Sequence, residues 1–292
     1  SLARIFGEAR AEEAAALAER APVDLRVNTL KTDVARALKA LAPFEPQAPG
    51  LASNALRVPA PEAAERAGAV EAVPQFGKGW FEVQDLGSQV AALAAGEVKG
   101  KQVLDLCAGG GGKTLALAAA MANTGQIYAY DADARRLTDT VRRGERAGLR
   151  NLQVRTPLAR DPLKGLEGRM DVVFIDAPCT GTGSWRRHPD TKWRLTPDAL
   201  ERRQKDQDQV LDDGAAFVKP GGRIVYVTCS VLPEEDEDRV EAFLVRHPGF
   251  ARRPATDSPD LARYLTTEGD LRLSPRTSGT DGFFVAVLEN AR

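Results

Sequence analysis

Short apolar runs alternate with longer amphipathic stretches from about residue 84 to the end of the chain. Runs rich in Val, Ile and aromatic residues predict buried strands, and apolar residues that recur every three or four positions predict helices between them. We expect strands over 103–106, 126–130, 152–155, 171–175, 223–228, 270–274 and 283–288. We expect helices over 86–95, 113–122, 133–147, 197–218 and 234–246. This alternation indicates an α/β fold with a doubly wound, mostly parallel sheet.

The first part of the chain follows a different pattern. An alanine-rich helix is expected within 1–20, strands over 23–30 and 56–58, and a helix over 34–41. The segment 42–50 contains three prolines and a glycine, and this composition predicts a loop. We therefore expect a small α+β subdomain over 1–83, followed by the larger domain over 84–292.

Composition limits the class of protein. The chain has 292 residues, of which 43% are hydrophobic and 28% charged, as in globular proteins. No apolar run approaches the roughly 18 residues of a membrane span, and no signal segment opens the chain. Three cysteines in no paired framework favour a reduced, cytoplasmic protein. Two histidines and no Cys-x-x-Cys pair argue against a metal site. The first residue is Ser1 rather than Met, as expected of a fragment or a processed product.

Charge is distributed unevenly, although the formal net charge is only −1. Arginines are concentrated in 142–160, further basic residues lie in 186–194, and 234–238 is strongly acidic. A run of charge by itself predicts a solvated face. Two basic clusters in one chain nevertheless favour a nucleic-acid partner.

Four polar segments follow predicted strands. They are 105–113, Asp131, 176–179 and 228–229. Ligands of doubly wound sheets bind outside the carboxyl ends of the strands, at the switch point. We therefore expect the four segments to meet in one crevice.

The glycine-rich segment 107–113 is compatible with three kinds of nucleotide site. A P-loop would need glycine where Cys107 stands, and a dinucleotide fingerprint would need glycine where Thr114 stands. The third interpretation is a turn around an adenosyl cofactor, with Asp131 accepting hydrogen bonds from the ribose hydroxyls. Asp133 is the better candidate for the N-cap of the following helix, which leaves Asp131 for a ligand.

Two cysteines lie just beyond strand ends, Cys179 after Asp176-Ala177-Pro178 and Cys229 after Thr228. A lone cysteine is most often a small buried hydrophobe, but an activated thiolate is a strong nucleophile. Methylation at carbon 5 of a pyrimidine needs a thiolate that adds to C6, an acid near N3 and a sulfonium methyl donor. Cys229, Asp176 and the 107–113 turn supply these parts. Cys107 is expected to pack beside its strand and to contact the cofactor through its backbone.

Seven segments together resemble a known family. Residues 104–114, 176–183 and 226–235 (LDLCAGGGGKT, DAPCTGTG and YVTCSVLPEE) are similar to motifs of the S-adenosylmethionine-dependent RNA (cytosine-5) methyltransferases of the Sun/Nop type. Within that family the bacterial small-subunit rRNA methyltransferase B group is most similar. The supporting segments are 25–31, 84–89, 187–193 and 279–284.

The resemblance implies specific roles. Cys229 would be the nucleophile, Cys179 would assist release of the methylated RNA, and Asp176 would stabilise the activated base. The residues implied to hold S-adenosylmethionine are Cys107, Ala108, Gly109, Gly110, Gly111, Gly112, Lys113, Asp131 and Asp176. Two positions depart from the family pattern: Gly110 replaces a usual proline, and Thr156-Pro157 replaces an acid after the third strand.

We therefore expect a Rossmann-like methyltransferase domain over 84–292 and an RNA-binding subdomain over 1–83, acting as a monomer on rRNA. A tRNA (cytosine-5) methyltransferase is the alternative within the class. Outside the class, the alternatives are a non-catalytic RNA-binding ribosome-assembly factor and an NAD(P)-dependent oxidoreductase.

Overall fold

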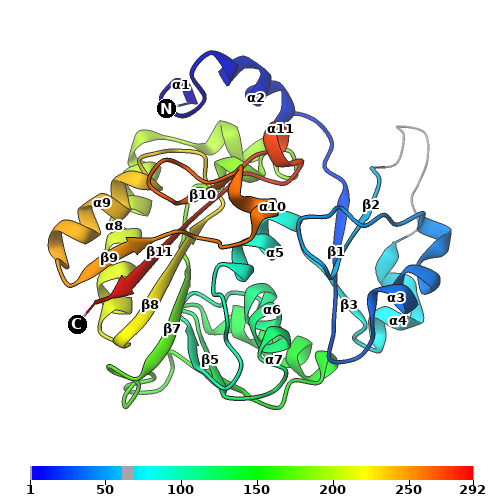
Figure 1. Ribbon diagram of the computed structural model, residues 1–292, viewed down its shortest axis with the longest axis horizontal. Helices are drawn as coiled ribbons and strands as arrows, with labels where there is room; N and C mark the ends of the chain where they lie inside the picture. Colours follow the sequence, from blue (N-terminus) through cyan, green and yellow to red (C-terminus); the bar gives the residue numbers. More distant parts are fainter. Residues whose placement is uncertain (1, 61–68, 292) are drawn as a thin grey trace.

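The computed structural model describes residues 2–60 and 69–291, and its centre is a large twisted sheet (Figure 1). The strand order is β10-β11-β8-β7-β4-β5-β6, and β9 also pairs with β11. The strands are β4 (Gln102–Asp105), β5 (Gln126–Tyr130), β6 (Leu152–Arg155), β7 (Met170–Asp176), β8 (Val218–Thr228), β9 (Phe250–Arg253), β10 (Leu271–Leu273) and β11 (Phe283–Asn290).

The neighbouring strands β6, β5, β4, β7 and β8 run parallel. β11 is antiparallel to β8, β9 and β10. The expected doubly wound, mostly parallel α/β sheet is therefore confirmed. The expected strands are all present, but β9 and the short β3 (Phe81–Val83) were not predicted.

Helices cover both faces of the large sheet, so its strands are buried on both sides. Their bounds are α5 (Leu86–Leu93), α6 (Gly112–Ala120), α7 (Ala134–Ala147), α8 (Pro197–Ala215), α9 (Glu237–Arg246), α10 (Pro259–Ala262) and α11 (Pro275–Ser278). Val103 and Val225 pack on one face with Val90 of α5. Their neighbours Leu104 and Ile224 pack on the other face. The helix expected over 197–218 ends at Ala215, and β8 begins at Val218.

A second, three-stranded antiparallel sheet has the order β2-β1-β3. It contains β1 (Val23–Val27) and β2 (Ala55–Val58), and its own core includes Leu25, Leu56 and Phe81. The helices α3 (Val34–Ala40) and α4 (Pro74–Gly77) lie beside it (Figure 1). The strand expected over 23–30 ends at Val27.

The first helices lie away from the small sheet. α1 (Leu2–Phe6) and α2 (Arg10–Ala16) lie at the top of the view, and α2 is next to α11 (Figure 1). Glu13 is fully buried, and its Oε2 accepts a hydrogen bond of 2.9 Å from Ser274 Oγ. Within the described residues, no helix is both long enough and apolar enough to cross a bilayer.

Candidate active site

The register of the large sheet brings the predicted segments together. Asp105 lies opposite Phe174 of β7, and Asp176 lies opposite Val227 of β8. The carboxyl ends of β4, β7 and β8 are therefore nearly level. The glycine-rich turn, Asp176, Cys179 and Cys229 extend from this one edge, as the sequence predicted.

The glycine-rich turn forms a tight backbone cradle between β4 and α6. Gly109 and Gly111 have φ angles of 53° and 82°, which favour glycine. A Cβ atom on Gly111 would lie 2.9 Å from Thr140 Oγ1 and 3.1 Å from Thr140 Cα, so no larger residue fits without movement of α7. A Cβ atom on Gly110, where the resemblance predicts proline, would have its nearest contact at 3.5 Å. The cradle therefore depends on Gly111, whereas Gly110 has room for a side chain.

Asp131 joins this turn to β5. Its Oδ2 accepts a hydrogen bond of 2.8 Å from the Gly109 amide, and its Oδ1 accepts one of 2.8 Å from the Asp133 amide. Arg136 lies 3.3 Å from Oδ2, but its side chain is 61% exposed. Each carboxylate oxygen has two lone-pair sites, so Asp131 retains acceptor capacity for hydroxyl groups. The turn and Asp131 therefore fit an adenosyl cofactor.

Asp133 is the N-cap of α7, as predicted, because its side chain accepts a hydrogen bond from the Arg135 amide. The segment after β6 contributes no acid at the position where the resemblance predicts one. There Thr156 Oγ1 accepts a hydrogen bond of 3.3 Å from the Leu158 amide.

Lys113 contacts Asp176 rather than extending into solvent. Its Nζ donates a hydrogen bond of 2.7 Å to Asp176 Oδ2. Burial by itself lowers the pKa of Lys113, but the charge of Asp176 and this hydrogen bond outweigh burial and raise the pKa. Lys113 therefore stays protonated and links the turn to the carboxylate. The sequence placed Lys113 only among the cofactor-binding residues.

The two predicted cysteines form a close pair, with their Sγ atoms 3.4 Å apart. Both side chains are half-buried. The hydrogen bond to Cys229, followed by burial and by the charges of Cys229 and Glu235, raises the pKa of Cys179 well above its usual value. Cys179 is therefore favoured as the protonated member of the pair.

Asp105 is the last residue of β4, and Cys107 is the first residue of the glycine-rich turn. Burial, followed by the charges of Asp105, Asp176 and Asp131, raises the pKa of the Cys107 thiol well above its usual value. The raised pKa disfavours the thiolate, and Cys107 packs against the core, in agreement with the packing predicted for it. Asp105 Oδ2 accepts a hydrogen bond of 2.6 Å from Thr114 Oγ1, and burial raises the pKa of Asp105 to about 7.

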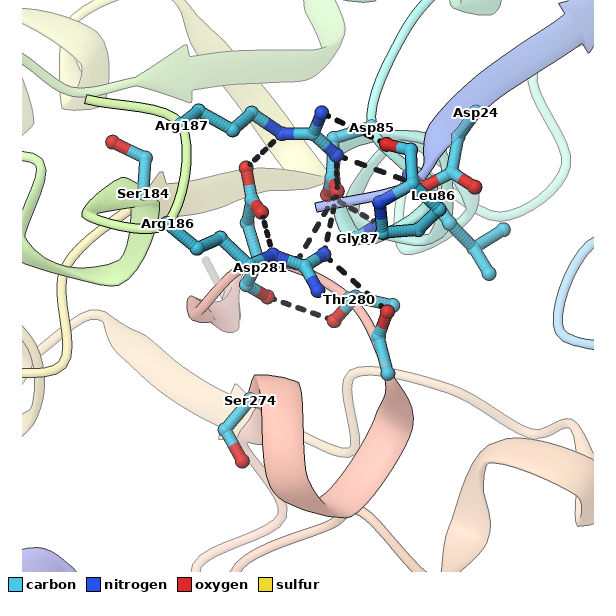
Figure 2. A network of polar contacts seen from close by, with 12 residues as sticks. Asp24, Asp85, Leu86, Gly87, Ser184, Arg186, Arg187, Ser274, Thr280 and Asp281 are labelled. Atoms are coloured by element: carbon cyan, nitrogen blue, oxygen red, sulfur yellow. Dashed lines mark hydrogen bonds and ion pairs between the residues drawn. The ribbon is translucent and has the colours of Figure 1, made fainter. Parts of the chain in front are cut away.

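The loop that follows Cys179 is anchored by a buried ion network (Figure 2). Arg187 Nε donates to Asp281 Oδ2 at 2.7 Å, and its Nη2 donates to Asp85 Oδ2 at 2.9 Å. Arg186 pairs with the same two carboxylates. The backbone continues the contact, since the Gly282 amide donates to Gly183 O and the Gly183 amide donates to Cys229 O.

Several arginines of the predicted basic clusters are therefore at least partly buried and paired with carboxylates of the same chain. Arg186 and Arg187 belong to the ion network, and Arg143 and Arg146 pair with buried Glu82 at 3.0 and 2.6 Å. These four side chains hold parts of the protein together. In 186–194 the exposed side chains include Lys192, Trp193 and Arg194, and Trp193 is 81% exposed.

Comparison with known proteins shows which proteins this chain resembles in sequence. A profile of the family described as 16S rRNA methyltransferase RsmB/F matches residues 92–289. A probable ribosomal RNA small subunit methyltransferase B of Synechocystis is 33% identical over 98% of this chain and 64% of its own length. The ribosomal RNA small subunit methyltransferase B of Salmonella typhi is 39% identical over 75% of this chain and 49% of its own length. The chain thus spans about half to two thirds of these relatives.

A solved structure has the same architecture. The crystal structure of a methyltransferase homolog protein from Pyrococcus horikoshii has a TM-score of 0.82 and 29% sequence identity. The match covers 99% of this chain and 93% of that one. Both sheets of the present structure therefore lie within the aligned region.

Proposed function

Because the chain belongs to the RsmB/F family of 16S rRNA methyltransferases, we propose that it methylates carbon 5 of a cytosine in small-subunit rRNA. The observation that carries this proposal is the Cys179–Cys229 pair beside the Lys113–Asp176 ion pair, at the sheet edge that also carries the glycine turn. These are the nucleophile, the acid and the cofactor cradle that C5 methylation needs.

The cofactor of this family is S-adenosylmethionine. When bound, it supplies an electrophilic methyl group on a sulfonium. In our proposal residues 107–113 and Asp131 hold it. Gly111 allows the backbone to approach the ligand closely, and Asp131 accepts hydrogen bonds from hydroxyl groups.

Cys229 is the proposed nucleophile. Its Sγ forms a bond to C6 of the cytosine, and the displaced electron pair makes C5 nucleophilic. Asp176 binds the ring at the N3 edge. The ammonium group of Lys113 is held on Asp176 by the 2.7 Å hydrogen bond and places a positive charge beside the electron density that develops at N3. The cytosine must leave its stack to reach this edge of the sheet.

Cys179 is the proposed base for product release. The hydrogen bond and charge of Cys229 raise the pKa of Cys179 in the free enzyme. Both effects end once Cys229 Sγ is bonded to C6, so Cys179 then loses its proton more readily. Cys179 gives its own proton to solvent, and once C5 carries the transferred methyl group the Cys179 thiolate takes the proton from C5. The electron pair of that C–H bond re-forms the C5–C6 double bond, so the Cys229–C6 bond breaks and Cys229 leaves as a thiolate.

The test is methyl transfer from labelled S-adenosylmethionine to small-subunit rRNA and to tRNA, comparing wild type with Cys229→Ala. We expect label in 5-methylcytosine of rRNA, and a rate lower by roughly 10⁴ or more in the variant, because removal of a nucleophile removes the covalent route. Cofactor affinity of the variant should stay within a few-fold.

Two results would contradict the proposal. Wild-type activity in Cys229→Ala would remove Cys229 from the mechanism. Label confined to tRNA would make this chain a tRNA methyltransferase with the same chemistry.

A further inference from the structure

The acidic run 234–238 is not the solvated face that its composition predicts. Glu235 and Asp236 are both fully buried. Glu235 lies in the turn between β8 and α9, close to the two cysteine-bearing loops. A carboxylate in such a position needs hydrogen bonds to balance its lost hydration.

Glu235 receives hydrogen bonds from both loops and from α8. Its Oε1 accepts from the Thr180 amide at 2.8 Å and from Gln207 Nε2 at 3.0 Å. Its Oε2 accepts from Thr180 Oγ1 and, at 2.6 Å, from Ser230 Oγ. These four donors fill the roughly four lone-pair sites of a carboxylate. Within 2–60 and 69–291, Glu235 forms no ion pair with a basic side chain.

The donors are the immediate neighbours of the two thiols. Thr180 follows Cys179 directly, and Ser230 follows Cys229 directly. Gln207 Nε2 also donates to Pro178 O at 2.9 Å, on the other side of Cys179. One carboxylate thus connects the chain around each cysteine.

Glu235 is itself fixed to the strand that carries Cys229. Tyr226 is fully buried in β8, and its hydroxyl donates to the Glu235 carbonyl at 2.6 Å. A second bridge lies alongside, where Thr182 Oγ1 and Ser230 Oγ are 3.0 Å apart and the Val231 amide donates to Thr182 Oγ1 at 3.0 Å. The connection between the loops is therefore buried and anchored at both ends.

We propose that Glu235 is a positioning residue, which holds the Cys179 and Cys229 loops in register and so sets the placement of both thiols at the reacting base. The consequence for turnover rests on the proposed function. A displacement of about 1 Å in a reacting group can cost on the order of 10²-fold in rate. Glu235 does not touch the reacting atoms in this assignment.

The first experiment compares Glu235→Gln with wild type in steady-state methyl transfer. The amide has nearly the same shape, but its nitrogen cannot accept the hydrogen bonds that one carboxylate oxygen accepts. We expect kcat to fall roughly 10- to 100-fold, while KM for RNA and cofactor affinity stay within about threefold. Glu241→Gln is the matched control, since Glu241 lies on α9 with a side chain 61% exposed, and it should behave as wild type.

Thr180→Val and Ser230→Ala provide milder variants if Glu235→Gln does not fold. Each removes one hydroxyl that donates to Glu235, and each should lower kcat by less than Glu235→Gln. Combined with Glu235→Gln, neither should add its full effect, because the shared contact is already lost. Full additivity would overturn the assignment.

The second experiment needs no RNA. Iodoacetamide alkylates thiolates, and the rates at Cys179 and Cys229 can be followed separately by mass spectrometry across pH. In Glu235→Gln, the loss of the charge and of loop register should change the ratio of the Cys179 and Cys229 alkylation rates at least threefold. The pH profile of Cys179 alkylation should move to lower pH. An unchanged ratio would refute the positioning role. If wild type methylates no RNA, the proposed function fails, and the alkylation ratio still decides the role of Glu235.

Discussion

The two thiols of the Cys179–Cys229 pair lie 3.4 Å apart. The hydrogen bond to Cys229, burial and nearby negative charge raise the pKa of Cys179. These surroundings favour the protonated thiol of Cys179. In the proposed mechanism, Cys229 therefore attacks the base and Cys179 assists product release.

Replacement of Cys179 by Ala should trap the covalent complex. Without its thiolate the C5 proton is not removed, so the Cys229–C6 bond persists. We expect a protein–RNA band that survives denaturant in the presence of cofactor. The double variant Cys179→Ala/Cys229→Ala should give no such band, and its absence in the single variant would argue against a release role.

Asp131 and Asp133 allow a paired test of the cofactor site. Asp131→Ala should weaken S-adenosylmethionine binding about tenfold or more, since hydrogen bonds to a charged acceptor contribute roughly 1.5–3 kcal/mol. Asp133→Ala removes an N-cap and should cost about 1 kcal/mol of stability, with cofactor affinity unchanged. Calorimetric titration and thermal unfolding separate the two, and equal affinities would place the ribose contact elsewhere.

Residue-level inference from the sequence succeeded where a local rule applied. Asp133 caps a helix because its side chain reaches a backbone amide two residues away. The convergence of Asp176, Cys179 and Cys229 at one sheet edge was predictable because the strand ends of a doubly wound sheet meet there. The contacts of Lys113 with Asp176 and of Glu235 with Thr180 span 63 and 55 positions, and no local pattern encodes them.

At the level of elements, the segment η5 (Pro189–Arg194) presents an exposed aromatic surface near the anchored loop. Lys192 Nζ lies 5.0 Å from the centre of the Trp193 ring. Arg186 and Arg187 fix the start of this segment to the core. An exposed aromatic ring beside a cation suits stacking with an unpaired base.

Trp193→Ala should therefore weaken RNA binding by roughly tenfold, given about 1–3 kcal/mol per stacked base. Cofactor affinity should not change. Filter binding or fluorescence titration at fixed salt measures the effect, with Val245→Ala as control because Val245 is also exposed (82%) but lies on α9. Equal losses in the two variants would exclude specific stacking.

Element boundaries were predictable where the hydrophobic pattern was clear. The prediction failed where an element was too short to carry a pattern. β5 and β6 begin and end at the predicted residues. β9 has alternating half-buried and exposed residues over only four positions, and β3 has three residues. Their existence depends on pairing with β11 and β1, which is a tertiary property.

At the scale of the whole molecule, Glu82 joins the small sheet to the large domain. It lies in β3, is almost fully buried, and pairs with Arg143 and Arg146 of α7. Arg143 Nη1 also donates to Gly110 O at 2.5 Å, so the same contact reaches the glycine turn. The relation of the two sheets could not be predicted from the sequence, because the arginines were assigned to RNA rather than to Glu82.

Glu82→Ala should destabilise the protein by about 2–4 kcal/mol, because it leaves two largely buried guanidinium groups unpaired. Asp139→Ala is the control, since its pair with Arg142 is exposed on the same helix and should contribute less than about 0.5 kcal/mol. The midpoint of urea unfolding measures the stability change in both variants. Similar midpoints for the two variants would contradict the joining role of Glu82.

The ends of the large sheet have a consequence for behaviour in concentrated solution. A long, flat, apolar edge strand offers unpaired amides and carbonyls to another chain, which promotes fibrous aggregation. Here β6 ends one edge after four residues and carries Gln153 and Arg155, while β10 at the other edge has three residues. Both edge strands are short, and β6 is also polar, so neither offers a long apolar template for further strands. Extension of the large sheet at these two edges is thus disfavoured.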